Sequence, residues 1–295
     1  MDSKLIKVIS DPSTSISIEF YPPKDEDSRF HLLKETKKIS TLIDVSFFSV
    51  TYGAGGSTQA GTLELVTKLS QIYEERVVSH LTCIGATRSD LTELIKIYKE
   101  NNMFHILAIR GDIPEDFSKD KLVSSDFKYA IDLLKWLRDI GGFSSIGVAC
   151  YPEGHPETPD FEKDLEYFSE KIYAGADYAI SQFFFESNVW ESFLERCSRK
   201  NITIPLIPGV LPIRDIDQTI RFAKRCGANV PDGIANKLLK YKNDPTGFNE
   251  LSAEMTSQLI ISLEGLGSKH FHIYSLNRSN LIKLISDRLG WKKAN

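Results

Sequence analysis

A short apolar run of strand length, followed by a segment with helical spacing, recurs about eight times along this 295-residue chain. A buried parallel strand is a nearly continuous apolar run, and parallel strands need crossover helices between them. The expected strands cover 15–20, 44–50, 76–81, 105–109, 145–150, 178–181, 204–207 and 270–274. Eight such units in about 250 residues or more predict a (β/α)₈ TIM barrel. A doubly wound parallel sheet is the main alternative, although it usually has fewer strands.

Segments with helical periodicity fill the intervals between these strands. They are expected at 28–40, 62–75, 89–100, 124–139, 161–173, 188–199 and 215–226, with extra helices at 232–266 before the last strand and a final helix ending near 289. No shift in composition divides the chain. We therefore expect an N-terminal extension at 1–14 and a single barrel domain at 15–295.

Composition narrows the class of partner. A net charge of −4 leaves no basic surplus for nucleic acid or an anionic membrane, so a small molecule is the expected ligand. The four cysteines are widely spaced, without a C-x-x-C pair, which argues against a zinc knuckle or a disulfide framework. The chain also has no signal-peptide core and no transmembrane-length apolar run. These features predict a cytoplasmic protein, and they leave open whether it forms a homo-oligomer.

Polar or charged residues stand at the carboxyl ends of most expected strands. They are Glu19, Thr51, His80, Arg110 with Asp112, Tyr151 with His155, Gln182, Pro208-Gly209 and Arg278. Ligands of barrels and open α/β sheets bind at this end of the strands, so we expect these residues to converge on one mouth. No lysine ends a strand, which argues against a Schiff-base aldolase. The carboxylates lack metal-ligand spacing, and no metal is expected.

Glu19 is the candidate acid of this mouth. It is followed by Phe20, Tyr21 and Pro22, and apolar surroundings disfavour the charged form of a carboxyl group. We expect Glu19 to be able to hold a proton near neutral pH, as a general acid must. The same position also suits a solvated strand end.

Other candidates have structural explanations as well. Arg110 and Asp112 could form a structural ion pair, and His80 could be a hydrogen-bonded core residue. His270 and His272 share one face of an expected strand, a spacing compatible with a metal, but no third ligand lies nearby in sequence. The glycines at 53–56 do not form a dinucleotide fingerprint, because Thr58 occupies the place of the last glycine.

Eight short motifs, in order along the chain, resemble the catalytic domain of the 5,10-methylenetetrahydrofolate reductase family. They are 19–23 (EFYPP), 49–54 (SVTYGA), 80–83 (HLTC), 107–112 (LAIRGD), 151–156 (YPEGHP), 182–185 (QFFF), 207–212 (IPGVLP) and 276–278 (LNR). The resemblance implies a TIM barrel that holds FAD and reduces methylenetetrahydrofolate with NADH or NADPH by a ping-pong hydride transfer. It places this chain with the short, bacterial-type form, in one-carbon metabolism and methionine supply.

The resemblance also implies roles for individual residues. Glu19 matches the general acid, and Asp112 matches a carboxylate that contacts both pterin and flavin. The implied FAD contacts are Thr51, Tyr52, Ala54, His80, Arg110, Gly111, Asp112, Tyr151, His155, Asp164 and Lys171. The implied substrate contacts are Asp112, Gln182, Gln218, Phe222 and Arg278. Arg110 and Lys171 suit a phosphate or ribose because both are cations. Tyr167 and Glu170 depart from the pattern, since some members have an amide and an arginine there.

Two other functions fit the residues. One is a pterin-binding barrel that transfers a one-carbon group without redox chemistry. The other is a flavin barrel similar to proline dehydrogenase. Oxidation of NAD(P)H separates the family reaction from the first, and turnover of proline separates it from the second.

Overall fold

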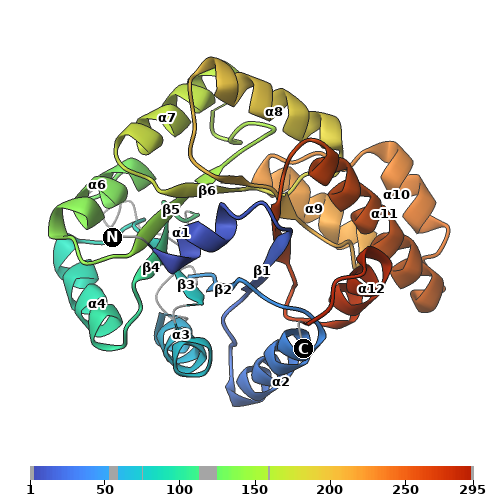
Figure 1. Ribbon diagram of the computed structural model, residues 1–295, viewed down its shortest axis with the longest axis horizontal. Coiled ribbons are helices and arrows are strands. Elements are labelled where there is room, and N and C mark those ends of the chain that lie inside the picture. Colours follow the sequence, from blue (N-terminus) through green and yellow to red (C-terminus); the bar gives the residue numbers. More distant parts are fainter. Residues whose placement is uncertain (1–2, 53–58, 75, 113–124, 159, 294–295) are drawn as a thin grey trace.

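The computed structural model describes residues 3–52, 59–74, 76–112, 125–158 and 160–293. Figure 1 shows strands at the centre of the molecule with helices arranged around them. This is the α/β barrel that the alternation of strands and helices predicts, and a doubly wound open sheet is excluded. None of the described helices is both long and apolar enough to cross a membrane.

All strand pairs are parallel, and the strands follow the order β7-β6-β5-β4-β3-β2-β1-β9-β8. Their bounds are β1 Ser15–Phe20, β2 Phe47–Val50, β3 Val77–Thr82, β4 His105–Ile109, β5 Ser145–Cys150, β6 Tyr178–Ser181, β7 Leu206–Ile207, β8 Gly209–Val210 and β9 His270–Tyr274. The expected strand at 44–50 was too long, because β2 begins only at Phe47. Just before β2, the Ser46 N–H donates to the Ile16 carbonyl of β1.

The barrel closes through β7 and β8, which occupy one barrel position. β7 pairs with β6, β8 pairs with β9, and Pro208 lies between them. Proline has no N–H to donate to a ladder, which explains the interruption. The Pro208 carbonyl still accepts a hydrogen bond from the His272 N–H at 3.0 Å, so contact with β9 is kept. Eight barrel positions therefore match the eight predicted strands.

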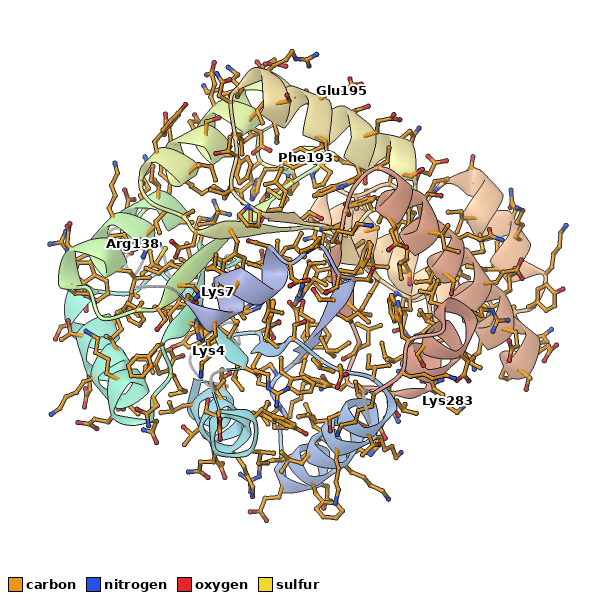
Figure 2. The ribbon with its side chains drawn as sticks, viewed as in Figure 1. Lys4, Lys7, Arg138, Phe193, Glu195 and Lys283 are labelled. Carbon is orange, nitrogen blue, oxygen red and sulfur yellow. The ribbon has the colours of Figure 1, made fainter. Side chains whose placement is uncertain are left out.

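Helices surround the barrel. Their bounds are α1 Lys4–Ile9, α2 Glu26–Leu42, α3 Gln59–Tyr73, α4 Arg88–Glu100, α6 Ala130–Ile140, α7 Phe161–Tyr173, α8 Ser187–Arg199, α9 Ile216–Cys226, α10 Asp232–Leu239, α11 Pro245–Gly265 and α12 Asn280–Leu289. The extra helices predicted before the last strand are α10 and α11. The helix predicted at 124–139 starts at Ala130, because the Asp132 carboxylate accepts the N–H groups of Lys128 and Tyr129 and stops the helix there. Figure 2 shows Phe193 on the inner side of α8 and Glu195 on its outer side.

Successive side chains of a strand point to opposite sides, so one set packs beneath the helices and the other lies inside the barrel. Residues such as Ile16, Ile18 and Phe20 point outward into the large core beneath the helices. Ser15, Ser17 and Glu19, the alternate residues of β1, contact groups inside the barrel. The barrel interior next to β1 and β9 is therefore polar.

The N-terminal extension contains a helix that covers one end of the barrel. Leu5 and Ile9 of α1 are buried against Phe47, Val78 and Tyr178, which lie at or near the starts of their strands. Figure 1 shows α1 lying across the ring of strands, and its Lys4 and Lys7 are labelled in Figure 2. The amino-terminal end of the barrel is thus covered, and the mouth for ligands is at the opposite end.

Candidate active site

The carboxyl ends of the parallel strands meet at the end of the barrel opposite α1. Thr51, Arg110, Tyr151 and Gln182 directly follow β2, β4, β5 and β6 respectively, while Glu19 and His80 lie near the ends of β1 and β3. Arg278 follows β9 by four residues. The predicted strand-end residues therefore share one mouth, as parallel pairing requires. Ala54 and the glycines at 53–56 lie outside the described residues.

Glu19 is buried inside the mouth, with 7% of its surface exposed. Its Oε2 lies 3.3 Å from His272 Nε2 and 3.4 Å from His80 Nε2. Register pairs Glu19 with Tyr274 on β9. Glu19 is therefore not a solvated strand end. Its surroundings are more polar than the sequence suggested, because two imidazoles face the carboxylate.

His80 is not the satisfied core histidine that was one expectation. The ring is buried, and its Nε2 has no hydrogen-bond partner among the described residues, since its contact with Glu19 lies outside hydrogen-bond geometry. Burial lowers the pKa of His80 to about 4, an effect that the Glu19 charge opposes. The ring is thus neutral near pH 7 and holds an unused polar nitrogen near Glu19.

Arg110 has a carboxylate partner, but it is not Asp112. Its two terminal nitrogens donate to the Glu157 carboxylate at 2.5 and 2.6 Å, in the bidentate geometry that guanidinium favours. This hydrogen bond raises the pKa of Arg110 and lowers that of Glu157. Asp112 is exposed. The structural ion pair suggested for Arg110 and Asp112 is therefore replaced by one with Glu157.

Tyr151, His155, Asp164 and Lys171 form a group between the end of β5 and α7. The Tyr151 and His155 rings meet edge to face with centroids 4.6 Å apart. The backbone N–H of His155 donates to the Asp164 carboxylate, while burial, the larger effect, raises the pKa of Asp164. Lys171 Nζ donates to the Ala149 carbonyl at 2.6 Å, and burial lowers its pKa. The four predicted residues are thus adjacent.

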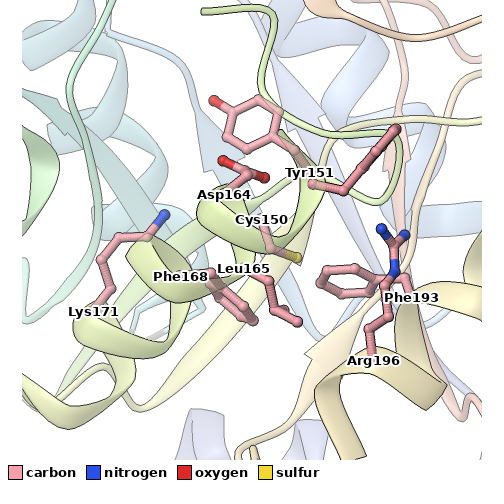
Figure 3. A pocket seen from close by; sticks show the side chains of 9 residues that line it. Cys150, Tyr151, Asp164, Leu165, Phe168, Lys171, Phe193 and Arg196 are labelled. Atoms are coloured by element: carbon pink, nitrogen blue, oxygen red, sulfur yellow. The ribbon is translucent and has the colours of Figure 1, made fainter. Parts of the chain in front are cut away.

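Figure 3 shows the small pocket beneath this group, between α7 and α8. Tyr151, Asp164 and Lys171 line it together with Phe168 and Arg196. Tyr167 and Glu170, the two departures from the family pattern, are exposed on α7. An exposed Glu170 does not place its charge beside the ammonium of Lys171, the cation of this group.

Three of the predicted substrate residues, Gln182, Gln218 and Phe222, belong to or lie near an apolar patch of the mouth. Phe183, next to Gln182, lies 5.2 Å from Phe222 and 6.0 Å from Tyr274 between ring centroids. Gln182 uses its Oε1 to accept the Phe183 N–H. Gln218, one helical turn before Phe222, is exposed on α9.

Arg278 belongs to a cationic part of the same rim. It is exposed, and its Nη1 lies 3.4 Å from His31 Nε2. Burial lowers the pKa of the Arg214 guanidinium, and the positive charge of nearby Arg278 lowers it further. This rim suits an anionic group of a ligand.

Sequence reasoning missed three partners at the mouth. His272 was considered only as half of a metal pair, whereas its partner is Glu19. Glu157 and Tyr274 were not considered. Tyr274 donates to the Ser181 carbonyl at 2.7 Å and so joins β9 to β6. The alternation at 270–274 could have indicated that His270, His272 and Tyr274 face one side, but not which residues they meet.

One structural observation indicates that the described residues fit a flavin. The unpartnered His80 Nε2 is a buried polar atom at the mouth, near Glu19, and an isoalloxazine ring offers hydrogen-bonding atoms along its edge. Arg110 and Lys171 are cations near the other predicted contacts. Both are already engaged, Arg110 by Glu157 and Lys171 by a carbonyl, so a diphosphate would have to share or replace those partners.

Comparison with known proteins identifies the family. The family model for methylenetetrahydrofolate reductase matches residues 4–290. A 5,10-methylenetetrahydrofolate reductase of Pectobacterium carotovorum is 34% identical over 276 residues, covering 94% of this chain and 90% of that protein. The methylenetetrahydrofolate reductase (NADH) 1 of Zea mays is 28% identical, and the match covers 93% of this chain but 48% of the maize protein.

A solved structure confirms the architecture. An uncharacterised protein from Clostridium thermocellum that binds two copies of 5-methyl-5,6,7,8-tetrahydrofolic acid superposes with a TM-score of 0.62. The superposition covers 95% of this chain and 96% of that one, at 17% identity. At this identity the likeness establishes the fold only.

Proposed function

Because the chain belongs to the methylenetetrahydrofolate reductase family, we propose that it reduces 5,10-methylenetetrahydrofolate to 5-methyltetrahydrofolate with electrons from NADH or NADPH. The proposal includes FAD as a bound cofactor and a ping-pong order, in which the nicotinamide nucleotide leaves before the folate enters. The setting is one-carbon metabolism and methionine supply in the cytoplasm.

The position of Glu19 is the observation that carries the proposal. Opening the methylene bridge of the folate requires a proton at the departing nitrogen. A carboxyl group that is buried at a ligand mouth, between two imidazoles, can hold a proton and deliver it to a bound substrate. Glu19 is therefore the proposed general acid.

The other residues bind and orient. The apolar patch of Phe183 and Phe222 suits a pterin or nicotinamide ring, with the Gln182 amide at its edge. Arg278 and Arg214 on the rim suit the carboxylates of the folate's glutamate. Asp112, exposed near Arg110, Tyr151 and His155, is the proposed carboxylate facing the pterin.

FAD would lie against His80, Thr51 and Tyr52, with its diphosphate toward Arg110, His155 and Lys171. When bound, the flavin supplies the hydride chemistry, accepting two electrons from the nucleotide and passing them to the folate. The protein contributes orientation, charge and the exclusion of water.

Two measurements test the proposal. The visible spectrum of the purified protein should show an oxidised flavin that NADH bleaches without oxygen and methylenetetrahydrofolate restores. A colourless protein that binds no added FAD contradicts the flavin, absence of NAD(P)H oxidation favours a one-carbon transferase, and bleaching by proline favours a proline dehydrogenase.

The second measurement assigns Glu19. In Glu19→Gln, electron transfer from NADH to a quinone should stay close to wild type, while folate reduction falls by about a hundredfold or more, the usual contribution of a general acid. The quinone reaction is the internal control for folding and cofactor binding. Equal loss of both reactions would make Glu19 a structural residue.

A further inference from the structure

A continuous column of hydrogen-bonding side chains runs through the barrel interior from Glu19 toward the end covered by α1. His272 Nε2 lies 3.3 Å from Glu19 Oε2, and its Nδ1 lies 2.7 Å from Ser17 Oγ. Ser17 Oγ is also 2.9 Å from His270 Nε2, and His270 Nδ1 is 2.5 Å from Ser15 Oγ. The column Glu19–His272–Ser17–His270–Ser15 therefore alternates between β1 and β9.

The rings of the column are held in place. Phe47 of β2 stacks on both imidazoles, with centroids 5.4 Å from His270 and 5.9 Å from His272. Ser17 and His272 have no exposed surface, and His270 has 4%. Packing of this kind prevents the rings from turning to choose other partners. Among the described residues, His272 Nε2 also lies 3.4 Å from Ser49 Oγ, and the other hydrogen bonds of the two rings lie within the column.

A neutral imidazole has one donor nitrogen and one acceptor nitrogen, and a serine hydroxyl has one hydrogen. Burial, together with His272, lowers the pKa of His270 to about 3, so this ring is neutral at physiological pH. If Ser17 donates to His272 Nδ1, then His270 must donate to Ser17 from Nε2. When Ser17 donates to His272, the hydrogen bonds of the column therefore all point toward Glu19.

Resting on the proposed function of Glu19, we infer that Ser17, His270 and His272 are positioning residues that act through one another on the general acid. When Glu19 is ionised, the donors point toward it in series: Ser15 to His270, His270 to Ser17, Ser17 to His272, and His272 to the carboxylate. A carboxylate that accepts such a bond is stabilised more than its neutral form. The column thus presents a donor to the ionised carboxylate and fixes its orientation.

Other titratable groups face Glu19 and remain unchanged in the test. They are His80 on β3, Tyr274 on β9 and Tyr21 just after β1, and all three have pKa values that respond to the Glu19 charge. Substitutions in the column leave these groups in place. A change in the behaviour of Glu19 can therefore be assigned to the column.

The first test is spectroscopic and needs no substrate. In the full-length protein, ring-nitrogen NMR should show His270 and His272 as the same tautomer, both protonated on Nε2 when Glu19 is ionised. Ser17→Ala removes the shared hydroxyl, and His270 should then change its tautomer or its ring-nitrogen shifts. Opposite tautomers in the unmodified protein would overturn the inference whether or not the protein reduces folate.

The second test measures the effect on the acid. In Ser17→Ala, folate reduction should fall by about tenfold, a fraction of the contribution of a general acid, and the pH at which this activity is lost should rise. NADH oxidation by a quinone should not change. His270→Phe keeps an aromatic ring and breaks the column one step further from Glu19. In this variant the pH at which folate reduction is lost should shift in the same direction, by a smaller amount.

Ser145→Ala is the matched control. The Ser145 hydroxyl also contacts a buried imidazole, His105 Nδ1 at 2.8 Å, but it stands on β5 and, among the described residues, makes no hydrogen bond to Glu19 or to the column. This variant should leave the pH profile of folate reduction unchanged. Equal shifts in Ser17→Ala and Ser145→Ala, or no shift in Ser17→Ala, would refute a positioning role. If the unmodified protein does not reduce methylenetetrahydrofolate, the proposed function is refuted instead.

Discussion

The pairing of Arg110 with Glu157 makes a prediction about cofactor affinity. If Arg110 binds a diphosphate, the Glu157 carboxylate competes with that ligand for the same guanidinium nitrogens. Glu157→Gln removes the competing charge and keeps the shape of the side chain. We therefore expect the variant to bind FAD more tightly.

The magnitude follows from exposure. Side-chain exposure is 19% for Arg110 and 54% for Glu157, so solvent screens the pair and its contribution to stability is about 1 kcal/mol or less. When the ion pair no longer opposes cofactor binding, the dissociation constant of FAD should fall by up to about fivefold. Quenching of flavin fluorescence during titration of the apoprotein measures it.

A matched pair elsewhere separates this effect from a general change of charge. Glu250 accepts a hydrogen bond from Arg288 at 2.5 Å, with exposures of 46% and 33%, and neither residue follows a barrel strand at the mouth. Glu250→Gln should leave FAD affinity unchanged. Weaker FAD binding in Glu157→Gln would mean that Glu157 holds Arg110 in its binding position, and equal affinity would mean that Arg110 keeps no contact with the cofactor.

Two further predictions concern stability. Although burial acts to raise it, hydrogen bonds from Lys38 Nζ and the Ser279 N–H lower the pKa of Glu35 to about 2. A carboxyl group whose pKa is lowered in the folded protein stabilises the fold fully above its ordinary pKa of 4.5, and this stabilisation is lost as the pH falls toward 2. Glu35→Gln should lower the free energy of unfolding by about 2 kcal/mol near neutral pH and by less in acid, and a pH-independent difference in denaturant titrations would contradict this. Leu5→Ala removes a buried contact of α1 with the barrel and should lower the free energy of unfolding by about 2 to 4 kcal/mol, measured by thermal or denaturant unfolding. Val8→Ala, on the exposed side of the same helix, should lower it by under about 0.5 kcal/mol. Equal losses in the two variants would mean that α1 does not stabilise the barrel.

Local patterns predicted the barrel well. Continuous apolar runs and helical spacing depend on neighbours a few residues away, so the strands, the helices and the extra helices before β9 could be located from sequence. Glu19, Arg110, Tyr151 and Gln182 were placed at one mouth for the same reason, because parallel strands must bring their carboxyl ends together. The start of α6 was misplaced, since Asp132 stops the helix through hydrogen bonds that helical periodicity does not reveal.

The partners of these residues were decided only by tertiary structure. Glu19 and His272 are 253 positions apart, and Arg110 and Glu157 are 47 apart. Alternation along a strand indicates that His270 and His272 share a side, but the pairing of β1 with β9 determines that serines and a carboxylate meet them. Sequence by itself therefore determined which side chains reach the barrel mouth and interior. Strand register determined which of them are close enough to share a proton, because hydrogen bonds act over about 3 Å and local sequence does not encode distances across the barrel.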